Sequence, residues 1–403
     1  MITTQQKQLV TATVPVLKEN GVLLTTHFYR RLFTYNPELK NVFNMGNQQN
    51  GRQQTALAMA VLAYAEHIED PSVLFPVVDR IGHKHTSLVI RPEHYAIVGH
   101  HLLESIREVL GEAATEPLIE AWGVAYNQLA KLMSGHEADL YSIQAALPGG
   151  WNGWREFVIK DKIEESTEIT SFHLYPADGG KISAHQPGQY LSVRLFLPEL
   201  DLMQPRQYSI SNSPNNLYYR ISVKRETGRE PNPDGMISNR LHNFIKTGDI
   251  IEVTAPAGSF VLQNPDKPVV FISGGVGQTP LISMMESLLK NKSDQSLIWI
   301  HGCRNQDVHA FKGVIEYWAT NHEKLKSHTF YNTIPVENQT ENTYKGIVNL
   351  KQLKEEIITE GAAYYICGPA GFIDKQFNEL KTLGVDSSAI YFEEFGPQAL
   401  VLN

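Results

Sequence analysis

The spacing of the apolar residues changes once along the chain, and this change constrains the fold more than any other feature. Up to about residue 147 the apolar residues recur at helical spacing and prolines separate the segments. Leu147-Pro-Gly-Gly-Trp151 interrupts the pattern as a linker would. After it, short segments alternate with a period of two. Because 403 residues also exceed one ordinary core, the sequence predicts several domains, with an all-α domain first.

Three helices of the first part are well marked. Their apolar stripes predict helices over about Gln53 to Ile68, Pro92 to Leu110, and Pro117 to about Tyr141. No strand-like alternation, repeat or low-complexity tract occurs in this part.

The part after the linker falls into two patterns. Short strands separated by glycine and proline turns predict an antiparallel β-barrel, with strands at 157–159, 170–174, 190–195 and 219–224. From about Pro265, short apolar strands alternate with helical segments, which indicates an α/β domain with a parallel sheet; its strands are expected at 269–273, 297–300 and 364–367.

The charge and the cysteines narrow the class of protein. A net charge of -8 argues against nucleic acid as the main partner. The first residues lack a secretory pattern, and no apolar run approaches the roughly 18 residues of a membrane span. Cys303 and Cys367 form no disulfide or zinc framework. We therefore expect a cytoplasmic protein in a reducing setting.

Arg206-Gln-Tyr-Ser209 has the residue types that a flavin dinucleotide requires. Arginine offers a planar fork to a pyrophosphate, the tyrosine ring can lie beside the isoalloxazine, and the serine hydroxyl can approach its reactive nitrogen. Gly235-Met-Ile-Ser-Asn239 is expected to precede a helix over Arg240 to Ile245, so that free N–H groups face a phosphate. The alternative is a barrel strand with a surface arginine and a packed tyrosine.

Ser273-Gly-Gly-Val-Gly-Gln-Thr-Pro280 follows a predicted strand and opens a helix. Its glycines let the backbone approach a pyrophosphate, although the spacing is not GxGxxG. Cys367-Gly-Pro369 ends a later strand, where open α/β sheets bind ligands; alternatively, Cys367 is a small core residue. No acidic residue follows the second strand, where His301-Gly-Cys-Arg304 lies, so the pattern favours neither NADH nor NADPH.

These motifs, in this order, resemble the ferredoxin–NADP reductase-like family over roughly residues 152 to 403. The resemblance implies a module that takes a hydride from NAD(P)H and passes it on from FAD as single electrons. It implies FAD contacts from Tyr190, Arg206, Gln207, Tyr208, Ser209, Ser238, Glu393, Phe395 and Gly396. It implies NAD(P)H contacts from Gly274, Gly275, Val276, Gly277, Gln278, Thr279 and Cys367.

The helical part must then hold the electron acceptor, and His85 is the candidate ligand. His83 and His85 differ by about 200° around a helix, so both cannot face one pocket. His85 lies on the apolar face, between Ile81 and Val89, whereas His83 falls with the polar residues. A histidine on an apolar stripe is more often a satisfied core residue. Upstream, a polar donor with apolar neighbours is what a distal gas pocket needs; the residues concerned are Tyr29, Phe43, Gln53 and Leu57.

Together these residues resemble a globin, and the whole chain resembles the flavohaemoglobins. The resemblance rests on Asn41-Val-Phe-Asn-Met45, Gln53 with Leu57, His83-Lys-His85, Gly149-Gly-Trp151, Arg206 to Ser209, Gly274 to Thr279 and Glu393 to Pro397. It implies nitric oxide dioxygenation, in which NO and O2 become nitrate with electrons from NAD(P)H through FAD and haem b.

The resemblance also implies roles for individual residues. His85 corresponds to the proximal iron ligand, with Tyr95 and Glu137 as its partners. The distal wall corresponds to Tyr29, Gln53 and Leu57. A carboxylate that accepts the free N–H of the ligand makes the imidazole a stronger donor to iron. Without the resemblance, Glu137 would be interpreted as a solvated helix residue.

Lys84 and Glu393 match positions that tune the haem and flavin potentials in the family, although either could simply be exposed. Glu393 rather than the adjacent Glu394 takes this role by alignment from Phe395, which is expected to cover the flavin ring. The expected domains are a globin at 1–138, a linker at 139–151, an FAD barrel at 152–262 and an NAD(P) domain at 263–403.

Two other functions stay open at this point. The protein could be an O2 or NO sensor or carrier whose reductase only keeps the iron ferrous. It could also be a flavin diaphorase whose helical domain binds no haem. In each case we expect a monomer whose partners are small molecules.

Overall fold

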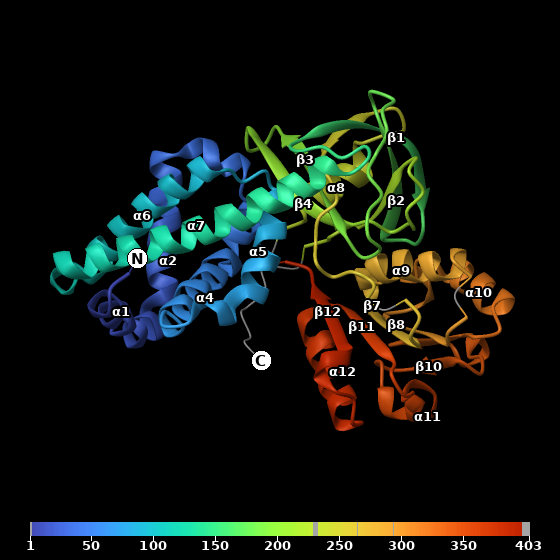
Figure 1. Ribbon diagram of the computed structural model, residues 1–403. Coiled ribbons are helices and arrows are strands. Elements are labelled where there is room, and N and C mark those ends of the chain that lie inside the picture. Colours follow the sequence, from blue (N-terminus) through green and yellow to red (C-terminus); the bar gives the residue numbers. More distant parts are fainter. Residues whose placement is uncertain (1, 229–232, 264, 293, 397–403) are drawn as a thin grey trace. The chain divides into compact units, whose positions relative to one another are not determined.

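A computed structural model describes residues 2–228, 233–263, 265–292 and 294–396 (Figure 1). It divides into two compact units. The first holds the residues up to Trp154 together with 192–206, and the second holds 155–191 and those from 207 to 396. The expected order of an all-α part, an antiparallel β part and a parallel α/β part is confirmed. Pro397, the last residue of one motif above, lies outside the described residues.

Within its described residues, the first unit is built mostly from seven α-helices, coloured blue to cyan-green in Figure 1. Their apolar faces meet in one core, in which Phe28, Leu32 and Ile68 are almost fully buried. The helices are α1 (Thr4–Thr11), α2 (Val14–Tyr35), α3 (Met45–Gln49), α4 (Arg52–Glu66), α5 (Phe75–Ser87), α6 (Pro92–Leu110) and α7 (Glu116–Ala146).

Two of the expected helices, α4 and α6, lie where the periodicity predicts them. Helix α7 differs, because it continues to Ala146 and so occupies residues 139–146, which were expected to begin the linker. The chain turns only at Leu147, where the backbone becomes extended. Glycine at position 149 has a positive φ of 74°, which fits the turn predicted there.

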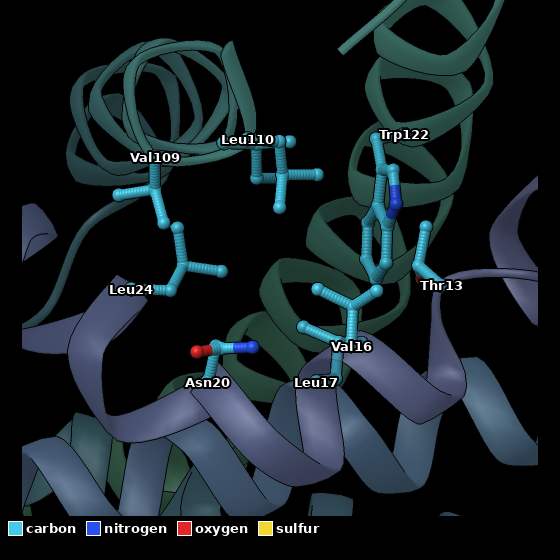
Figure 2. A pocket seen from close by; sticks show the side chains of 9 residues that line it. Thr13, Val16, Leu17, Asn20, Leu24, Val109, Leu110 and Trp122 are labelled. Carbon is cyan, nitrogen blue, oxygen red and sulfur yellow. The ribbon is translucent and has the colours of Figure 1, made fainter. Parts of the chain in front are cut away.

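A small cavity of about 20 Å³ lies in the first unit (Figure 2). Its walls come from α2, α6, α7 and Thr13, and none of the expected site residues lines it. Thr13 donates its hydroxyl to the carbonyl of Val10, and most of the other lining residues are apolar. The lining residues are Thr13, Val16, Leu17, Asn20, Leu24, Ile106, Val109, Leu110 and Trp122.

Residues 192–206 join the first unit through a buried glutamine. Gln204 has no exposed surface. Its amide donates to the carbonyl of Lys40 and accepts from the N–H of Met45. Asn41 accepts from the N–H of Met203 at 2.8 Å. The Asn41-Val-Phe-Asn-Met45 stretch is thus held by side chains and backbone from a strand far along the chain.

The antiparallel sheet has the order β4-β3-β6-β1-β2-β5, and its strands β1, β2, β5 and β6 belong to the second unit. A bridge between Ile210 and Ile221 links the end of β4 to β5, as closure into a barrel requires. Phe157 and Phe172 face inward and are fully buried. The strands are β1 (Arg155–Glu164), β2 (Ile169–Pro176), β3 (Tyr190–Leu197), β4 (Leu202–Ser209), β5 (Tyr219–Lys224) and β6 (Ile250–Val253).

The parallel sheet has the order β10-β9-β8-β7-β11-β12. Phe271, Trp299 and Tyr365 face α9 and α10, whereas their neighbours in sequence face α11 and α12, so both faces are covered. The chain reverses its direction of travel between β7 and β11. Open sheets of this kind bind ligands at such a switch point.

The strands of this sheet are β7 (Val269–Gly274), β8 (Leu297–Cys303), β9 (Leu325–Tyr331), β10 (Thr343–Lys345), β11 (Ala363–Gly368) and β12 (Ile390–Glu394). Its helices are α9 (Gln278–Lys290), α10 (Lys312–Asn321), α11 (Lys354–Ile357) and α12 (Ala370–Thr382). No helix among the described residues is long and apolar enough to cross a membrane.

Candidate functional site

His85 in the last turn of α5 meets a buried carboxylate of α7. Its Nδ1 lies 2.7 Å from Oε1 of Glu137 and 3.1 Å from the hydroxyl of Tyr95 on α6. Tyr95 donates its hydroxyl to the same carboxylate oxygen at 2.5 Å. Three helices thus bring together the three residues that the resemblance placed on the proximal side.

Glu137 is only 2% exposed, so the solvated alternative for this residue is wrong. Burial, reinforced by the hydrogen bond to Glu137, raises the pKa of Tyr95 well above its ordinary value, so Tyr95 stays a donor. Glu137 therefore accepts two hydrogen bonds away from water, which keeps the proton of His85 on Nδ1. The other ring nitrogen, Nε2, is left to bind a metal.

His83 and His85 lie on different faces of α5, as predicted. His83 is 3.8 Å from a carboxylate oxygen of Asp79 on the same helix. Helix α5 is shorter than the apolar pattern predicts: it ends at Ser87, and Leu88 is its C-cap. Val89 lies beyond it with a positive φ of 60°, so the apolar stripe ends one turn early. Lys84 lies in the last turn, where a cation complements the helix dipole.

Tyr29 on α2 is 4% exposed and packs edge-on against Phe43, with their ring centroids 5.8 Å apart. Burial raises its pKa to about 12, while hydrogen bonds from Gln53 and Gln48 act in the opposite direction. Tyr29 and Gln53 are therefore neighbours, as expected of a distal wall. Leu57, one turn after Gln53 on α4, is half-buried against the same core.

Gln48 on α3 was not predicted from the sequence. It lies in a polar stretch, Asn47-Gln-Gln-Asn50, that looks like a loop. The amide of Gln54 donates to its side chain and its carbonyl, which fixes α3 beside α4. Its side-chain hydrogen bond to Tyr29, which acts against burial to lower the pKa of that phenol, identifies Gln48 as a neighbour of Tyr29.

The donor set of the first unit fits a haem. A histidine whose Nδ1–H is held by a carboxylate is the usual geometry of a metal-ligating imidazole. The side chain of His85 keeps 31% of its surface exposed although its partner Glu137 is buried, so its free edge can be reached. The Tyr29 hydroxyl provides the polar group that a gas pocket needs.

The flavin motif forms the end of β4. Arg206 and Tyr208 share one side of the strand, whereas Gln207 and Ser209 share the other. Ser209 is 9% exposed. Tyr190, at the start of β3, forms two backbone hydrogen bonds with Ala257: each residue donates its N–H to the carbonyl of the other.

Gly258, the residue after Ala257, has a φ of 115°. A Cβ there would lie 2.9 Å from the ring of Tyr190, so glycine is required beside this aromatic side chain.

The helix expected at Arg240 begins four residues earlier. Helix α8 spans Met236–Asn243 with Gly235 as its N-cap, so most of the segment expected to precede it lies inside its first turn. Ser238 donates its hydroxyl to the carbonyl of Gly235 and accepts from the N–H of Glu226. The N–H groups of the first turn remain in place for a phosphate, and Ser238 is an anchor of the turn.

Glycine is required at different positions of the nucleotide loop for different physical reasons. A Cβ on Gly277 would collide with the carbonyl of Cys367, and one on Gly274 would press on the ring of Phe372. These two glycines therefore permit close packing of the protein on itself. Gly275 has a φ of 55° and open space around it, so it is the one that leaves room for a ligand.

The remaining loop residues pack inward. Val276 is half-buried, and its carbonyl accepts the hydroxyl of Thr279, which is buried. Gln278 is also fully buried, and its amide nitrogen and oxygen have no hydrogen-bond partner among the described residues. Buried amides are rarely left unpaired, which favours a polar ligand or water at this point.

Cys367 ends β11 between Ser273 of β7 and Glu393 of β12 in the parallel register. It is fully buried. Burial first, and then the charge of Glu393, raise the pKa of the thiol well above its ordinary value. Phe395 and Gly396 follow β12 and are exposed.

The chain matches two family models, and they fall on the two kinds of unit described above. Residues 26–133 match the globin family, and residues 271–376 match the oxidoreductase NAD-binding domain family. The first match spans α2 to most of α7. The second spans the parallel sheet from β7 to α12.

Curated relatives match over the whole length. The chain is 51% identical over 400 residues to the flavohaemoprotein of Bordetella parapertussis, covering 98% of this chain and 99% of the relative. It is 45% identical over 401 residues to the flavohaemoprotein of Rhizobium meliloti, covering 98% and 99%.

Solved structures agree in architecture. A flavohaemoglobin of Malassezia yamatoensis, solved with bound FAD and haem, is similar with a TM-score of 0.86 at 25% identity, covering 98% of this chain and 100% of that one. The FAD/NAD-binding domain of a nitric oxide dioxygenase from Vibrio cholerae is similar with a TM-score of 0.55 at 36% identity, covering 60% of this chain and 99% of that one.

Proposed function

Because the chain belongs to the flavohaemoprotein family, we propose that it is a nitric oxide dioxygenase, which converts NO and O2 to nitrate. As a member of that family it is an oxidoreductase that combines a globin with an NAD-binding reductase, and its cofactors are haem and FAD. Two NO and two O2 become two nitrates for each NAD(P)H, because the hydride carries two electrons and each nitrate takes up one.

The observation that carries the proposal is the hydrogen bond of 2.7 Å between His85 and the buried carboxylate of Glu137. A neutral acceptor would suffice for reversible gas carriage. A buried carboxylate gives the ligand more anionic character, which favours activation of O2 over storage. Tyr95, fixed by its own bond to Glu137, prevents the carboxylate from turning away.

Haem b, when bound, supplies the iron at which O2 and NO react. The chain does the rest on both sides. His85 would hold the iron through Nε2, while Glu137 would hold the proton on Nδ1. On the distal side, the Tyr29 hydroxyl would donate to the gas ligand, and its pKa of about 12 ensures that it carries its proton at any physiological pH. Gln53 orients that hydroxyl, and Leu57 helps to exclude water.

In the reductase, Arg206, Tyr208 and Ser209 hold FAD, with contacts from Tyr190, Gln207 and Ser238. The loop from Gly274 to Thr279 binds NAD(P)H at the switch point, with Gly275 leaving space for the pyrophosphate. Cys367 lies at the edge of the sheet where the nicotinamide is expected. Glu393 and Lys84 tune the flavin and haem potentials, and Phe395 with Gly396 closes over the flavin.

The proposed domain limits are 1–138 for the globin, 152–262 for the FAD barrel and 263–403 for the NAD(P) domain, with a linker between the first two. The proposed setting is the cytoplasm, where the protein acts as a monomer. Both cysteines are free thiols, which fits a reducing compartment.

The test combines a visible spectrum with NO consumption. The purified protein should show a Soret band and flavin absorption, and it should consume NO at saturating O2 only when NAD(P)H is present. A protein without a Soret band would be a diaphorase. A haem protein that binds O2 but does not turn over NO would be a carrier or sensor, and this result would overturn the proposal.

A further inference from the structure

Helices α5 and α7 pack closely at a glycine. A Cβ on Gly82 would lie 2.7 Å from Cδ2 of His136 and 3.3 Å from Cδ1 of Leu140, both on α7. Contacts of 2.7 Å are not tolerated, so glycine at this position sets how near the two helices come. Gly82 lies three residues before His85, and His136 lies next to Glu137.

The ring of His136 sits in a slot made by α5. Its Nε2 lies 3.0 Å from Oδ1 of Asp79, one turn before Gly82. The ring of Phe75 meets it edge-on, with the centroids 5.6 Å apart. Asp79 also lies 3.8 Å from Nε2 of His83, so one carboxylate organises both imidazoles. His136 is thus held by its hydrogen bond to Asp79 and packs against the surface of Gly82.

From this arrangement we propose that Asp79, Gly82 and His136 form a clamp that positions Glu137 against His85. The inference rests on the proposed function in one respect, namely that His85 is the iron ligand. The clamp residues touch neither the gas ligand nor the iron. They are positioning residues, because the register they impose between α5 and α7 fixes the distance of 2.7 Å between Glu137 and His85.

The reason that this distance matters is chemical. The share of negative charge that an imidazole passes to a metal depends on how strongly its other N–H is accepted. Hydrogen bonds weaken steeply once the atoms separate beyond about 3.2 Å. A shift of α7 along or away from α5 would therefore lengthen the hydrogen bond between Glu137 and His85. The imidazole would then pass less negative charge to the metal, while the helices stay folded.

Two glycines of this site allow a matched comparison. Gly82→Ala places a methyl group against His136, so either the ring leaves its slot or the helices move apart. Gly135→Ala on α7 gains the same helix propensity, but nothing lies within 4 Å of its added Cβ. Asp79→Ala releases the ring of His136 without adding volume. Glu137→Gln marks the result when the carboxylate charge itself is lost.

The measurement is the iron–histidine stretching band in the resonance Raman spectrum of the ferrous holoprotein, which needs neither NO nor O2. We expect the band of Gly82→Ala and Asp79→Ala to fall between those of the unchanged protein and Glu137→Gln. The band of Gly135→Ala should not move. Unfolding temperature, recorded in parallel, separates a change of position from loss of structure.

An unmoved band in haem-loaded Gly82→Ala and Asp79→Ala overturns the clamp. An equal shift in Gly135→Ala also overturns it, because the effect would then belong to any alanine in these helices. Should Gly82→Ala not load haem, Asp79→Ala decides alone. If the protein has no NO dioxygenase activity, the band positions still decide the clamp, so the two proposals fail separately.

Discussion

Glu393 stands beside Cys367 in the parallel register of β12 and β11, whereas Glu394 stands beside Gly368. Neighbouring side chains of paired residues point to the same face of a sheet. The charge of Glu393 raises the pKa of the Cys367 thiol, which shows that the carboxylate and the thiol are close. The register thus distinguishes two adjacent glutamates that look equivalent in the sequence.

This distinction predicts different effects on the flavin. A negative charge opposes reduction, because a reduced flavin gains negative charge. At an effective dielectric of about 20, a unit charge on the order of 10 Å from another contributes roughly 1 to 2 kcal/mol. Glu393→Gln should therefore raise the flavin midpoint potential by about 30 mV, and Glu394→Gln should change it much less. A spectroelectrochemical titration checks this, and equal shifts in the two variants would contradict it.

Haem attachment should depend on His85 alone. Of the two histidines, His85 has the buried Glu137 as its partner, whereas His83 faces Asp79. We expect stable haem incorporation to be lost in His85→Ala and kept in His83→Ala. The Soret absorbance relative to protein measures the outcome, and comparable loss in both variants would refute the assignment.

The reductase part should fold without the globin. The similar FAD/NAD-binding domain from Vibrio cholerae covers 60% of this chain and was solved by itself. A fragment beginning at Trp151 should bind FAD and reduce an artificial acceptor with NAD(P)H. Gln204→Ala in the full chain removes the same two hydrogen bonds, to Lys40 and Met45, that the fragment lacks, so this variant should keep its flavin content. An insoluble or flavin-free fragment would count against the prediction.

Local sequence patterns sufficed for the fold class, because the apolar period changes from helical to alternating at one linker. They failed at element ends. Helix α8 begins at Met236, directly after its N-cap Gly235. The sequence did not indicate this start, because the polar pair Ser238-Asn239 gives no periodic apolar signal. Helix α7 passes residue 139, but its last fully buried residue is Glu137, so beyond that point no buried apolar stripe marks the helix and only helical propensity indicates it.

The candidate site shows the same division. The residue types at His85, Tyr29 and the glycine loop carry their chemistry in the sequence. The partners of Glu137 and the neighbours of Gln48 come from other helices, and no single-sequence spacing encodes them. Gly277 is a different case, because the loop pattern predicts a ligand contact there, and the structure adds a second reason for glycine: a Cβ would collide with the carbonyl of Cys367.

Alkaline pH should destabilise the globin part through its buried tyrosines. Burial raises the pKa of Tyr29 and of Tyr64 from 10.0 to about 12. Between these values the unfolded chain has lost the phenolic proton and the folded chain has kept it. The folded state therefore binds more protons, and its stability, fully present below pH 10, falls as the pH rises towards 12.

For Tyr29 the loss amounts to roughly 2 to 3 kcal/mol across this range. Tyr29→Phe should remove the contribution of Tyr29 to this loss of stability. The urea midpoint, followed through the Soret band, should therefore fall less between pH 9 and pH 11 in this variant than in the unchanged protein. Equal falls would mean that Tyr29 is not shielded from water.

Removal of the Tyr29 hydroxyl should weaken the hold on O2 without affecting the reductase. Tyr29→Phe keeps the ring and its edge-on contact with Phe43, so packing is preserved. A buried hydrogen bond is typically worth about 1 kcal/mol, and more when its partner carries charge. We expect O2 to leave the ferrous protein at least about tenfold faster, which corresponds to roughly 1.4 kcal/mol. Stopped-flow O2 release measures this.

The matched control for Tyr29→Phe is Tyr64→Phe. Tyr64 is also buried, but its hydroxyl donates to the carbonyl of Ala125 at 3.0 Å and so serves the fold. This variant should lower stability and leave the O2 off-rate unchanged.

In both variants, reduction of the flavin by NAD(P)H should proceed at the unchanged rate, because neither tyrosine belongs to the reductase. NO turnover at low O2 should fall only in Tyr29→Phe. An O2 off-rate that does not change in Tyr29→Phe would show that the tyrosine only fills space.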